Sequence, residues 1–302
     1  MKKDFLCLTD WTLEELEKIF DLSRELKAKQ KNSEEHRLLQ GKTLGMLFEK
    51  SSTRTRVSFE VGMYQLGGHA LFLSSSTTQM GRGEPIKDTA RVMSRYVDGI
   101  MIRTFSQDAV EELARLSDIP VINGLTDSYH PCQLMADLFT VIEHKTNYRD
   151  LTYCWIGDGN NMANSWINAA AVFGFELRIA TPAGYEPDSQ VMARAEKMGA
   201  KVIYTNDPLE AARGAQVLNT DVWASMGQEE EQKEREKAFA NFQINSQVVA
   251  VADPECIVLH CLPAHRDEEI TDEVIEGPHS VVFDEAENRL HVQKAIMASL
   301  MA

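Results

Sequence analysis

The chain has 302 residues, of which 43% are hydrophobic and 25% are charged, as in an ordinary globular protein. Its formal net charge of −15 disfavours nucleic acids and anionic membranes as partners, because both are themselves negatively charged. The five cysteines form no C-x-x-C pair, which indicates a reduced compartment with neither structural disulfides nor a zinc site. The sequence shows no apolar run of about 18 residues and no signal-peptide pattern, so we expect a cytoplasmic protein.

In chain order, the first element that we expect is an amphipathic helix over residues 9–29, which Thr12 and Glu15 begin with a capping box. Residues 43–68 then form a strand, a polar turn and a helix. The strand, at residues 44–48, is a short apolar run. The helix is expected because its apolar residues recur at helical spacing.

Strands and helices alternate along the rest of the chain. In the first half, we expect strands at residues 70–73, 99–103 and 120–123 and helices at residues 89–96, 109–116 and 134–144. In the second half, we expect strands at residues 151–156, 176–180, 201–204, 217–219, 257–259 and 281–283 and helices at residues 162–173, 190–198, 208–213, 228–237 and 288–301. Such alternation is typical of parallel α/β sheets.

The length and this alternation predict two domains of about 150 residues. We expect an α/β fold with two doubly wound parallel-sheet domains joined by helices, at residues 1–133 and 134–286. A C-terminal helix at residues 287–302 is expected to pack back onto the first domain. Because open α/β sheets bind ligands beyond the carboxyl ends of their strands, we expect the active site in the cleft between the domains.

The segment SSTRTR, residues 51–56, concentrates hydroxyls and guanidiniums where a strand leads into a helix. Backbone N–H groups and the positive end of the helix dipole favour an anion there. Arginine forks match the oxygens of phosphate or carboxylate. The alternative is a serine cap followed by two solvated arginines, Arg54 and Arg56. Because two arginines and four hydroxyls coincide at one junction, the sequence favours an anion site.

Two further segments lie where strands are expected to end. His130 precedes a helix in HPCQ, residues 130–133, and the proline suits the first helical turn. GDGNN, residues 157–161, resembles a dinucleotide-binding turn but departs from G-x-G-x-x-G. The next strand ends in Thr181-Pro182 instead of the acidic residue that would hold a ribose. Nucleotide binding is therefore disfavoured.

SSTRTR is similar to the phosphate-binding signature of the aspartate/ornithine transcarbamoylase family, and HPCQ is similar to its second signature. TDVWASMG, residues 220–227, and HCLP, residues 260–263, resemble the segments that distinguish the ornithine-using members. The resemblance implies carbamoyl transfer from carbamoyl phosphate to the side-chain amine of L-ornithine, giving L-citrulline and phosphate in arginine metabolism. It implies no cofactor and no metal. HCLP continues as AHRDEE, where many relatives have a Phe-His-Asp run.

The resemblance also implies the site residues. Those implied for carbamoyl phosphate are Ser52, Thr53, Arg54, Thr55, Gln79, Arg103, His130, Gln133, Cys261, Leu262 and Arg289. Those implied for ornithine are Asn161, Asp221, Ser225 and Met226. In relatives the loop that corresponds to residues 74–88 leans across a trimer interface. We therefore expect a homotrimer, or a multiple of trimers, with shared active sites.

The chemistry of these residue types fits the reaction, with the catalytic roles implied for Arg54, Thr55, Arg103, His130, Asp221 and Cys261. Carbamoyl phosphate is a dianion with a good leaving group, so catalysis is mainly positioning and charge stabilisation. Deprotonating an amine with a pKa of about 10.4 near neutrality costs about 4 kcal/mol. Asp221 and Cys261 can steer that amine and its proton, and the leaving phosphate can also take the proton. No covalent role is expected for Cys261, because the amine is already the nucleophile.

Three alternatives remain at this point. The nearest is a transcarbamoylase for acetylornithine, putrescine or aspartate, and Asp221 together with the SMG segment counts against each. An alternative of another class is a dinucleotide-dependent dehydrogenase built on the GDGNN turn. The third is a non-catalytic ligand-binding relative, which should have lost a charged site residue, and none is lost here.

Overall fold

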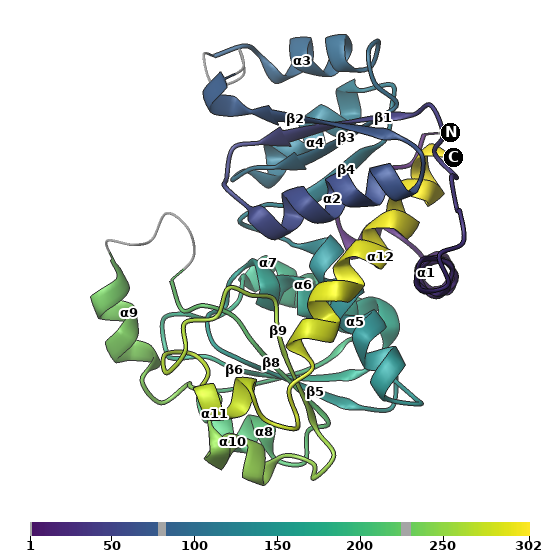
Figure 1. Ribbon diagram of the computed structural model, residues 1–302. Coiled ribbons are helices and arrows are strands. Elements are labelled where there is room, and N and C mark those ends of the chain that lie inside the picture. The colour runs from purple at the N-terminus through teal and green to yellow at the C-terminus, as the bar shows by residue number, and fades with distance from the viewer. Residues whose placement is uncertain (1, 78–82, 225–230) are drawn as a thin grey trace. The chain divides into compact units, whose positions relative to one another are not determined.

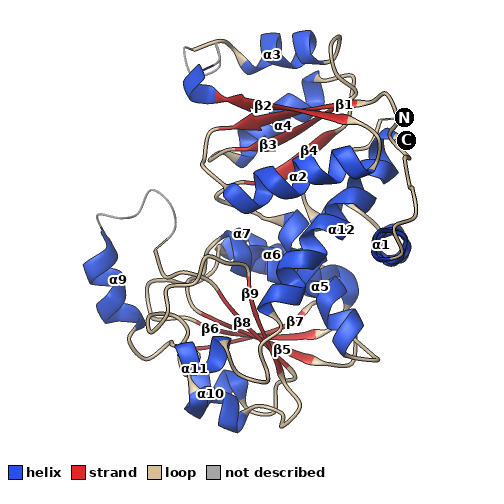
Figure 2. Cartoon of the chain, viewed as in Figure 1, coloured by secondary structure: helices blue, strands red, loops and turns tan. Residues whose placement is uncertain are grey.

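The computed structural model describes residues 2–77, 83–224 and 231–302 (Figure 1). The chain divides into two compact units, the first comprising Met1–Met135 with Asn288–Ala302 and the second Ala136–Glu287. Each unit contains one sheet of parallel strands together with helices (Figure 2). The two parallel-sheet α/β domains expected from the sequence are therefore confirmed. Within the described part of the chain, no helix has the length and apolarity that crossing a bilayer requires.

The first unit is built on a four-stranded parallel sheet with the strand order β2-β1-β3-β4. Its strands are β1 (Thr43–Phe48), β2 (His69–Ser74), β3 (Gly99–Arg103) and β4 (Val121–Leu125). Its helices are η1 (Leu8–Asp10), α1 (Leu13–Lys31), α2 (Thr53–Gln65), η2 (Ser75–Thr77), α3 (Ile86–Met93) and α4 (Gln107–Leu116). Strands β1 and β3 are almost entirely buried, which explains their continuous apolar sequences.

The second unit is built on a five-stranded parallel sheet with the strand order β7-β6-β5-β8-β9. Its strands are β5 (Thr152–Ile156), β6 (Glu176–Ala180), β7 (Lys201–Thr205), β8 (Val217–Thr220) and β9 (Ile257–His260). Its helices are α6 (Asn161–Phe173), α7 (Ser189–Lys197), α8 (Pro208–Ala212), α9 (Gln232–Phe239), α10 (Ser246–Val251) and α11 (Asp272–Ile275). Helices α5 (Pro131–His144) and α12 (Val282–Met301) contain the boundaries between the two units.

The strand order reverses once in each sheet, between β1 and β3 in the first unit and between β5 and β8 in the second. In open α/β sheets such a reversal marks where ligands bind, outside the carboxyl ends of the two strands. In the first unit Phe48 is aligned with Arg103, and the Glu49 N–H donates to the Arg103 carbonyl at 2.9 Å. Arg103 and the segment that begins α2 therefore lie at the same edge of the sheet.

Local capping determines where α1 and α2 begin. The Thr12 hydroxyl accepts from the Glu15 N–H, and the Glu15 carboxylate accepts from the Thr12 N–H at 2.9 Å, which confirms the expected capping box. The Ser52 Oγ accepts from the Thr55 N–H at 3.1 Å and caps α2. Helix α2 thus begins inside SSTRTR.

The apolar residues whose spacing predicts α2 lie on its exposed side. Val57 and Tyr64 expose 51% and 81% of their surface, whereas Phe59 is buried. On the buried side, a Cβ atom at Gly62 would lie 2.9 Å from the Met297 Cε atom. The close approach of α12 therefore determines which face of α2 is buried. The number of apolar residues on each face does not.

The strand expected at residues 281–283 is wrong. Ser280 makes an isolated bridge with Val258, and α12 begins at Val282. Acidic side chains occupy the first turn of α12, where the helix dipole favours them. A short apolar run cannot by itself distinguish a strand from the start of a buried helix. The short helices α10 and α11 have no counterpart among the expected elements.

Lys294 attaches α12 to two other segments of the first unit. Its ammonium is fully buried and donates to the Gln65 Oε1 atom at 2.9 Å and to the His36 Nε2 atom at 3.1 Å. Burial lowers the pKa of Lys294 from 10.5 to about 8. Between these two pH values the unfolded chain binds more protons than the folded chain, so this lysine makes the protein more stable as pH rises.

We expect the melting temperature of Lys294→Met, relative to wild type, to be higher at about pH 7 than at about pH 9.5. Burying the charged ammonium destabilises the wild-type protein below the folded-state pKa, and this cost is relieved above that pKa. The substitution removes the cost. Thermal unfolding at both pH values measures this difference. Lys18→Met is the control, since Lys18 is exposed on α1. An effect of Lys294→Met that is equal at both pH values would contradict the prediction.

Candidate functional site

The start of α2 presents a guanidinium and hydroxyls at the carboxyl end of β1. The Arg54 Nε atom is buried and has no hydrogen-bond partner among the residues that the structure describes. A buried donor without a partner is uncommon and calls for an explanation such as a ligand. Arg54 lies in the first turn of α2, where backbone N–H groups and the helix dipole also attract an anion. The anion site expected at SSTRTR therefore has a suitable local structure.

A second guanidinium reaches this point from the C-terminal helix. The Arg289 Nη2 atom donates to the Thr55 Oγ1 atom at 2.8 Å, and both side chains are almost completely buried. Arg103 at the end of β3 is also buried. Three guanidiniums, those of Arg54, Arg103 and Arg289, are thus held around the switch point of the first sheet, which suits a ligand that carries two negative charges.

His130 is a neutral imidazole in this environment. It precedes α5, and its carbonyl accepts from the Gln133 N–H at 3.1 Å. Burial, followed by the positive charges of Arg289 and Arg103, holds the pKa of His130 well below its usual value. The electrostatic effect of these two arginines shows that the structure brings the three residues together. A neutral imidazole offers one N–H donor without adding a further positive charge.

The other residues implied for the first unit differ in exposure. Gln133 lies in the first turn of α5 and is fully buried, whereas Thr53 is exposed at the start of α2. Gln79 lies outside the described residues.

The sequence analysis missed an ion pair that links two loops of the first unit. Lys50, directly before SSTRTR, pairs with Asp127, which lies three residues before His130. The Lys50 ammonium also lies 4.4 Å from the centre of the Phe105 ring. A single sequence contains no signal that pairs two positions so far apart, and the structure alone shows that this contact holds the two loops.

The second unit gathers its expected residues at the carboxyl ends of β5, β8 and β9. Asn161 begins α6 after β5, Asp221 follows β8, and Cys261 follows β9. The Asn160 side chain caps α6 by accepting from the Met162 N–H at 2.9 Å. These three strands are neighbours in the sheet, so the three expected site residues lie at one edge of it.

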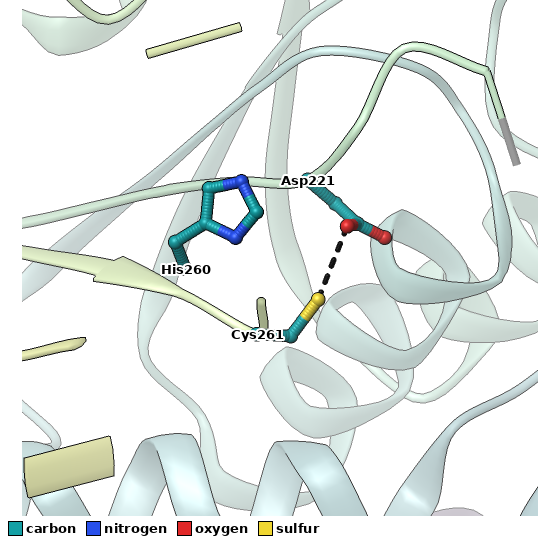
Figure 3. A group of neighbouring side chains, drawn as sticks. All are labelled: Asp221, His260 and Cys261. Atoms are coloured by element: carbon teal, nitrogen blue, oxygen red, sulfur yellow. Dashed lines mark hydrogen bonds between the residues drawn. The ribbon is translucent and has the colours of Figure 1, made fainter. Parts of the chain in front are cut away.

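Asp221 and Cys261 are in direct contact (Figure 3). The Cys261 thiol donates to the Asp221 Oδ1 atom at 3.1 Å, and the Val222 N–H donates to the same oxygen at 2.8 Å. Burial, and then the negative charge of Asp221, raise the pKa of Cys261 well above its usual value. Cys261 is therefore a neutral thiol at physiological pH, as a residue that orients a substrate without attacking it should be.

His260 lies beside this pair, and ligand atoms of Asp221, His260 and Cys261 come within 4.8 Å of one another (Figure 3). Both nitrogens of His260 are already engaged. Its Nδ1 atom accepts from the Leu262 N–H at 2.9 Å, and its Nε2 atom lies 2.9 Å from the Glu269 carboxylate. Because Nδ1 accepts, the proton is on Nε2 and is donated to Glu269. His260 thus orients the loop after β9 and offers no lone pair to a metal.

Two residues expected to contact ornithine, Ser225 and Met226, lie outside the described residues. Leu262 is described and adopts a left-handed backbone conformation, with φ of 55°, directly after Cys261. The hydrogen bond from its N–H to His260 holds this conformation.

The glycines of GDGNN have a packing explanation. A Cβ atom at Gly159 would lie 2.3 Å from backbone atoms of Glu186 and Pro187, and the Gly159 N–H donates to the Tyr185 carbonyl at 2.9 Å. The second glycine of the turn is therefore required for contact with another loop of the chain. A pyrophosphate need not be invoked to explain it.

Comparisons with known proteins agree with this geometry. Residues 3–143 match the family model described as aspartate/ornithine carbamoyltransferase, carbamoyl-P binding domain, and residues 149–300 match the Asp/Orn binding domain of the same family. The chain is 81% identical to the ornithine carbamoyltransferase of Syntrophotalea carbinolica and 66% identical to that of Geobacter sulfurreducens, with 100% of each chain covered. Its structure is similar to that of ornithine carbamoyltransferase from Pyrococcus furiosus, with a TM-score of 0.95, 51% identity and coverage of 99% of this chain and 97% of the other.

We expect Asp221→Asn to speed the alkylation of Cys261 by iodoacetamide, because removing the neighbouring negative charge lowers the thiol pKa. If the pKa falls by one unit, the thiolate fraction and the alkylation rate should rise by about tenfold. Mass spectrometry of digested protein measures the rate at each cysteine.

Cys256 is the internal control in the same samples, because its acidic neighbour is Asp253 and not Asp221. Its alkylation rate should be equal in the two proteins. An unchanged rate at Cys261 would show that Asp221 does not control the thiol.

Proposed function

The chain belongs to the aspartate/ornithine carbamoyltransferase family, and we propose on that premise that it transfers the carbamoyl group of carbamoyl phosphate to the side-chain amine of L-ornithine. The products are L-citrulline and phosphate, and the reaction belongs to arginine biosynthesis. The observation that carries this proposal is the group of three guanidiniums, Arg54, Arg103 and Arg289, around the switch point of the first sheet. A dianionic acyl phosphate is the kind of ligand that such a group fits.

In the proposed mechanism, the first unit holds the phosphate. The Ser52 and Thr53 hydroxyls and the Arg54 guanidinium donate to its oxygens, and the start of α2 adds backbone N–H groups. Because this leaving group already carries its negative charge, the enzyme has to orient it and does not have to protonate it before the bond breaks.

The carbonyl oxygen of the carbamoyl group is the second point of stabilisation. It gains negative charge when the amine adds, and Arg103, Thr55 and neutral His130 are the donors that we assign to it. One such donor is typically worth about 3 kcal/mol in the transition state. We assign Gln133, which also lies at the start of α5, to the carbamoyl amino group, since an amide oxygen can accept from it.

The second unit binds the nucleophile in this proposal. Asp221 accepts from the α-ammonium group of ornithine, and Asn161 donates to the α-carboxylate. The neutral amine nitrogen attacks the carbonyl carbon, the bond from that carbon to the phosphate oxygen breaks, and the proton lost by nitrogen leaves with phosphate. We assign Cys261 and Leu262 to contacts with both substrates. The thiol of Cys261 stays protonated throughout, which its contact with Asp221 supports.

A homotrimer, or a multiple of trimers, in the cytoplasm remains part of this proposal. The exposed apolar side chains of α2, among them Val57, Val61 and Tyr64, support contact between copies of the chain. Gln79, in the loop that we expect to be shared between copies, lies outside the described residues.

We expect Arg54→Ala to leave the fold intact and to lower the rate of citrulline formation by about a hundredfold or more, because Arg54 stabilises a dianion and not a core. Circular dichroism and steady-state assays measure the two effects. Arg24→Ala is the matched control, since Arg24 pairs with Asp21 at 2.8 Å on exposed α1 and should remain within about twofold of wild type. A loss below about threefold for Arg54→Ala would contradict its role.

The choice of substrate tests the proposed function directly. We expect kcat/KM for ornithine to exceed that for putrescine and acetylornithine by about a hundredfold or more, because each analogue leaves a polar group of the site unpaired. Aspartate should not react, since its side-chain carboxylate would face Asp221, and lysine should react weakly because it is one methylene longer. Citrulline and phosphate release are the measured products. If putrescine or acetylornithine equalled ornithine, the alternative transcarbamoylase would be the correct assignment.

A further inference from the structure

A buried arginine in the second unit bridges two loops that carry proposed ornithine residues. Arg235 on α9 is only 7% exposed. Its Nη1 atom donates to the Asp158 Oδ2 atom at 3.0 Å and to the Trp223 carbonyl at 2.9 Å. Its Nε atom donates to the Glu231 carboxylate at 3.2 Å. A guanidinium offers several donors in a fixed plane, so one side chain can hold these groups in one geometry.

The two loops that Arg235 joins meet at the switch point of the sheet. Asp158 lies in the turn after β5, in the same turn as Asn160 and directly before α6, which Asn161 begins. Trp223 lies in the segment after β8, two residues beyond Asp221. Since β5 and β8 are neighbouring strands, the bridge spans the edge where Asn161 and Asp221 are placed.

Arg235 also balances charge at this edge. Burial raises the pKa of Asp158, the charge of Arg235 opposes that rise, and the negative charge of Asp221 adds to it. The carboxylates of Asp158 and Asp221 are thus close enough to repel each other. Without Arg235, Asp158 would be a buried carboxylate with no cation to compensate it, and the repulsion would displace one of the two acidic loops.

We propose that Arg235 is a positioning residue for the amino-acid substrate, which acts by holding the Asp158 turn and the Asp221–Trp223 segment in register. This inference rests on the proposed function, in which Asp221 and Asn161 bind ornithine. Arg235 does not touch the substrate. It sets the distance between Asp221 and Asn161, which bind the substrate. Substrate binding by two such groups is sensitive to errors of about an ångström in the distance between them.

A purely structural role is the competing explanation. Arg235 lies 5.1 Å from the Tyr185 ring, and Tyr185 packs against the core residue Phe239. If Arg235 served only this packing, its loss would lower stability without discriminating between the two substrates. A positioning role requires that the two Michaelis constants respond differently.

The test uses the full-length enzyme with Arg235→Gln, which keeps a polar side chain but removes the charge. We expect KM for ornithine to rise by about tenfold or more, KM for carbamoyl phosphate to stay within about twofold, and kcat to fall less than kcat/KM for ornithine. Arg235→Lys, which restores the charge but not the planar fork, should lie between wild type and Arg235→Gln.

Arg178→Gln is the matched control. Arg178 is a partly buried arginine of the same unit that pairs with Glu176 at 2.8 Å and donates to the Arg213 carbonyl at 2.8 Å, on β6 and away from the switch point. Both Michaelis constants should be unchanged in this variant, while the melting temperature falls. If Arg235→Gln fails to fold, Asp158→Asn removes the same ion pair from the other side with little change in volume, and it should raise KM for ornithine in the same selective way.

Different results would overturn the proposed function and the positioning role of Arg235. Wild-type enzyme that makes no citrulline from ornithine would overturn the proposed function. Wild-type enzyme that makes citrulline, together with an Arg235→Gln or Asp158→Asn variant in which both Michaelis constants are unchanged or rise equally, would overturn the positioning role alone.

Discussion

The reversal of strand order in each parallel sheet is the constraint on which the rest of this protein depends. Parallel strands bring all their carboxyl ends to one edge, and the reversal separates the helices that follow two neighbouring strands. In the first unit, β1 and β3 deliver the start of α2 and Arg103 to that edge. In the second, β5 and β8 deliver Asn161 and Asp221. The functional side chains therefore follow from topology, and loops supply only the final geometry.

Fixed charges of opposite sign act on a titratable group in each of the two units. The first unit holds the guanidiniums of Arg103 and Arg289 beside His130, whose pKa they depress. The second holds Asp221 beside Cys261, whose pKa it raises. Both titratable groups are thereby kept neutral. Placing charged residues beside a titratable group that they keep neutral is unfavourable. Such an arrangement persists in a folded protein only when the neighbouring backbone holds the charged residues in place, as the helix caps and the strand pairing do here.

Much of the fold could be predicted from the sequence because its strands are short, buried and apolar, and its helices have caps. The limits of β3 and β6 agree with the expected ones to the residue. The failures share one cause. The apolar run at residues 281–283 could not be identified as a helix start, and the sequence could not decide which side of α2 is buried, because both depend on partners distant in the chain.

The sequence by itself determined which chemical groups are available: SSTRTR, HPCQ and the segments after β8 and β9 contain the charges and hydroxyls that the proposed substrates, an acyl phosphate and an amino acid, require. Only the tertiary structure decided how these groups are held. Arg289 forms a hydrogen bond with Thr55, Lys50 an ion pair with Asp127, and Arg235 an ion pair with Asp158. The partners in each pair are far apart in the sequence, and no local pattern predicts these contacts. The physical reason is that residue types and their short-range spacing can be read from the sequence directly. Which distant residues pair depends on packing and on the compensation of buried charge, and both of these are properties of the folded chain.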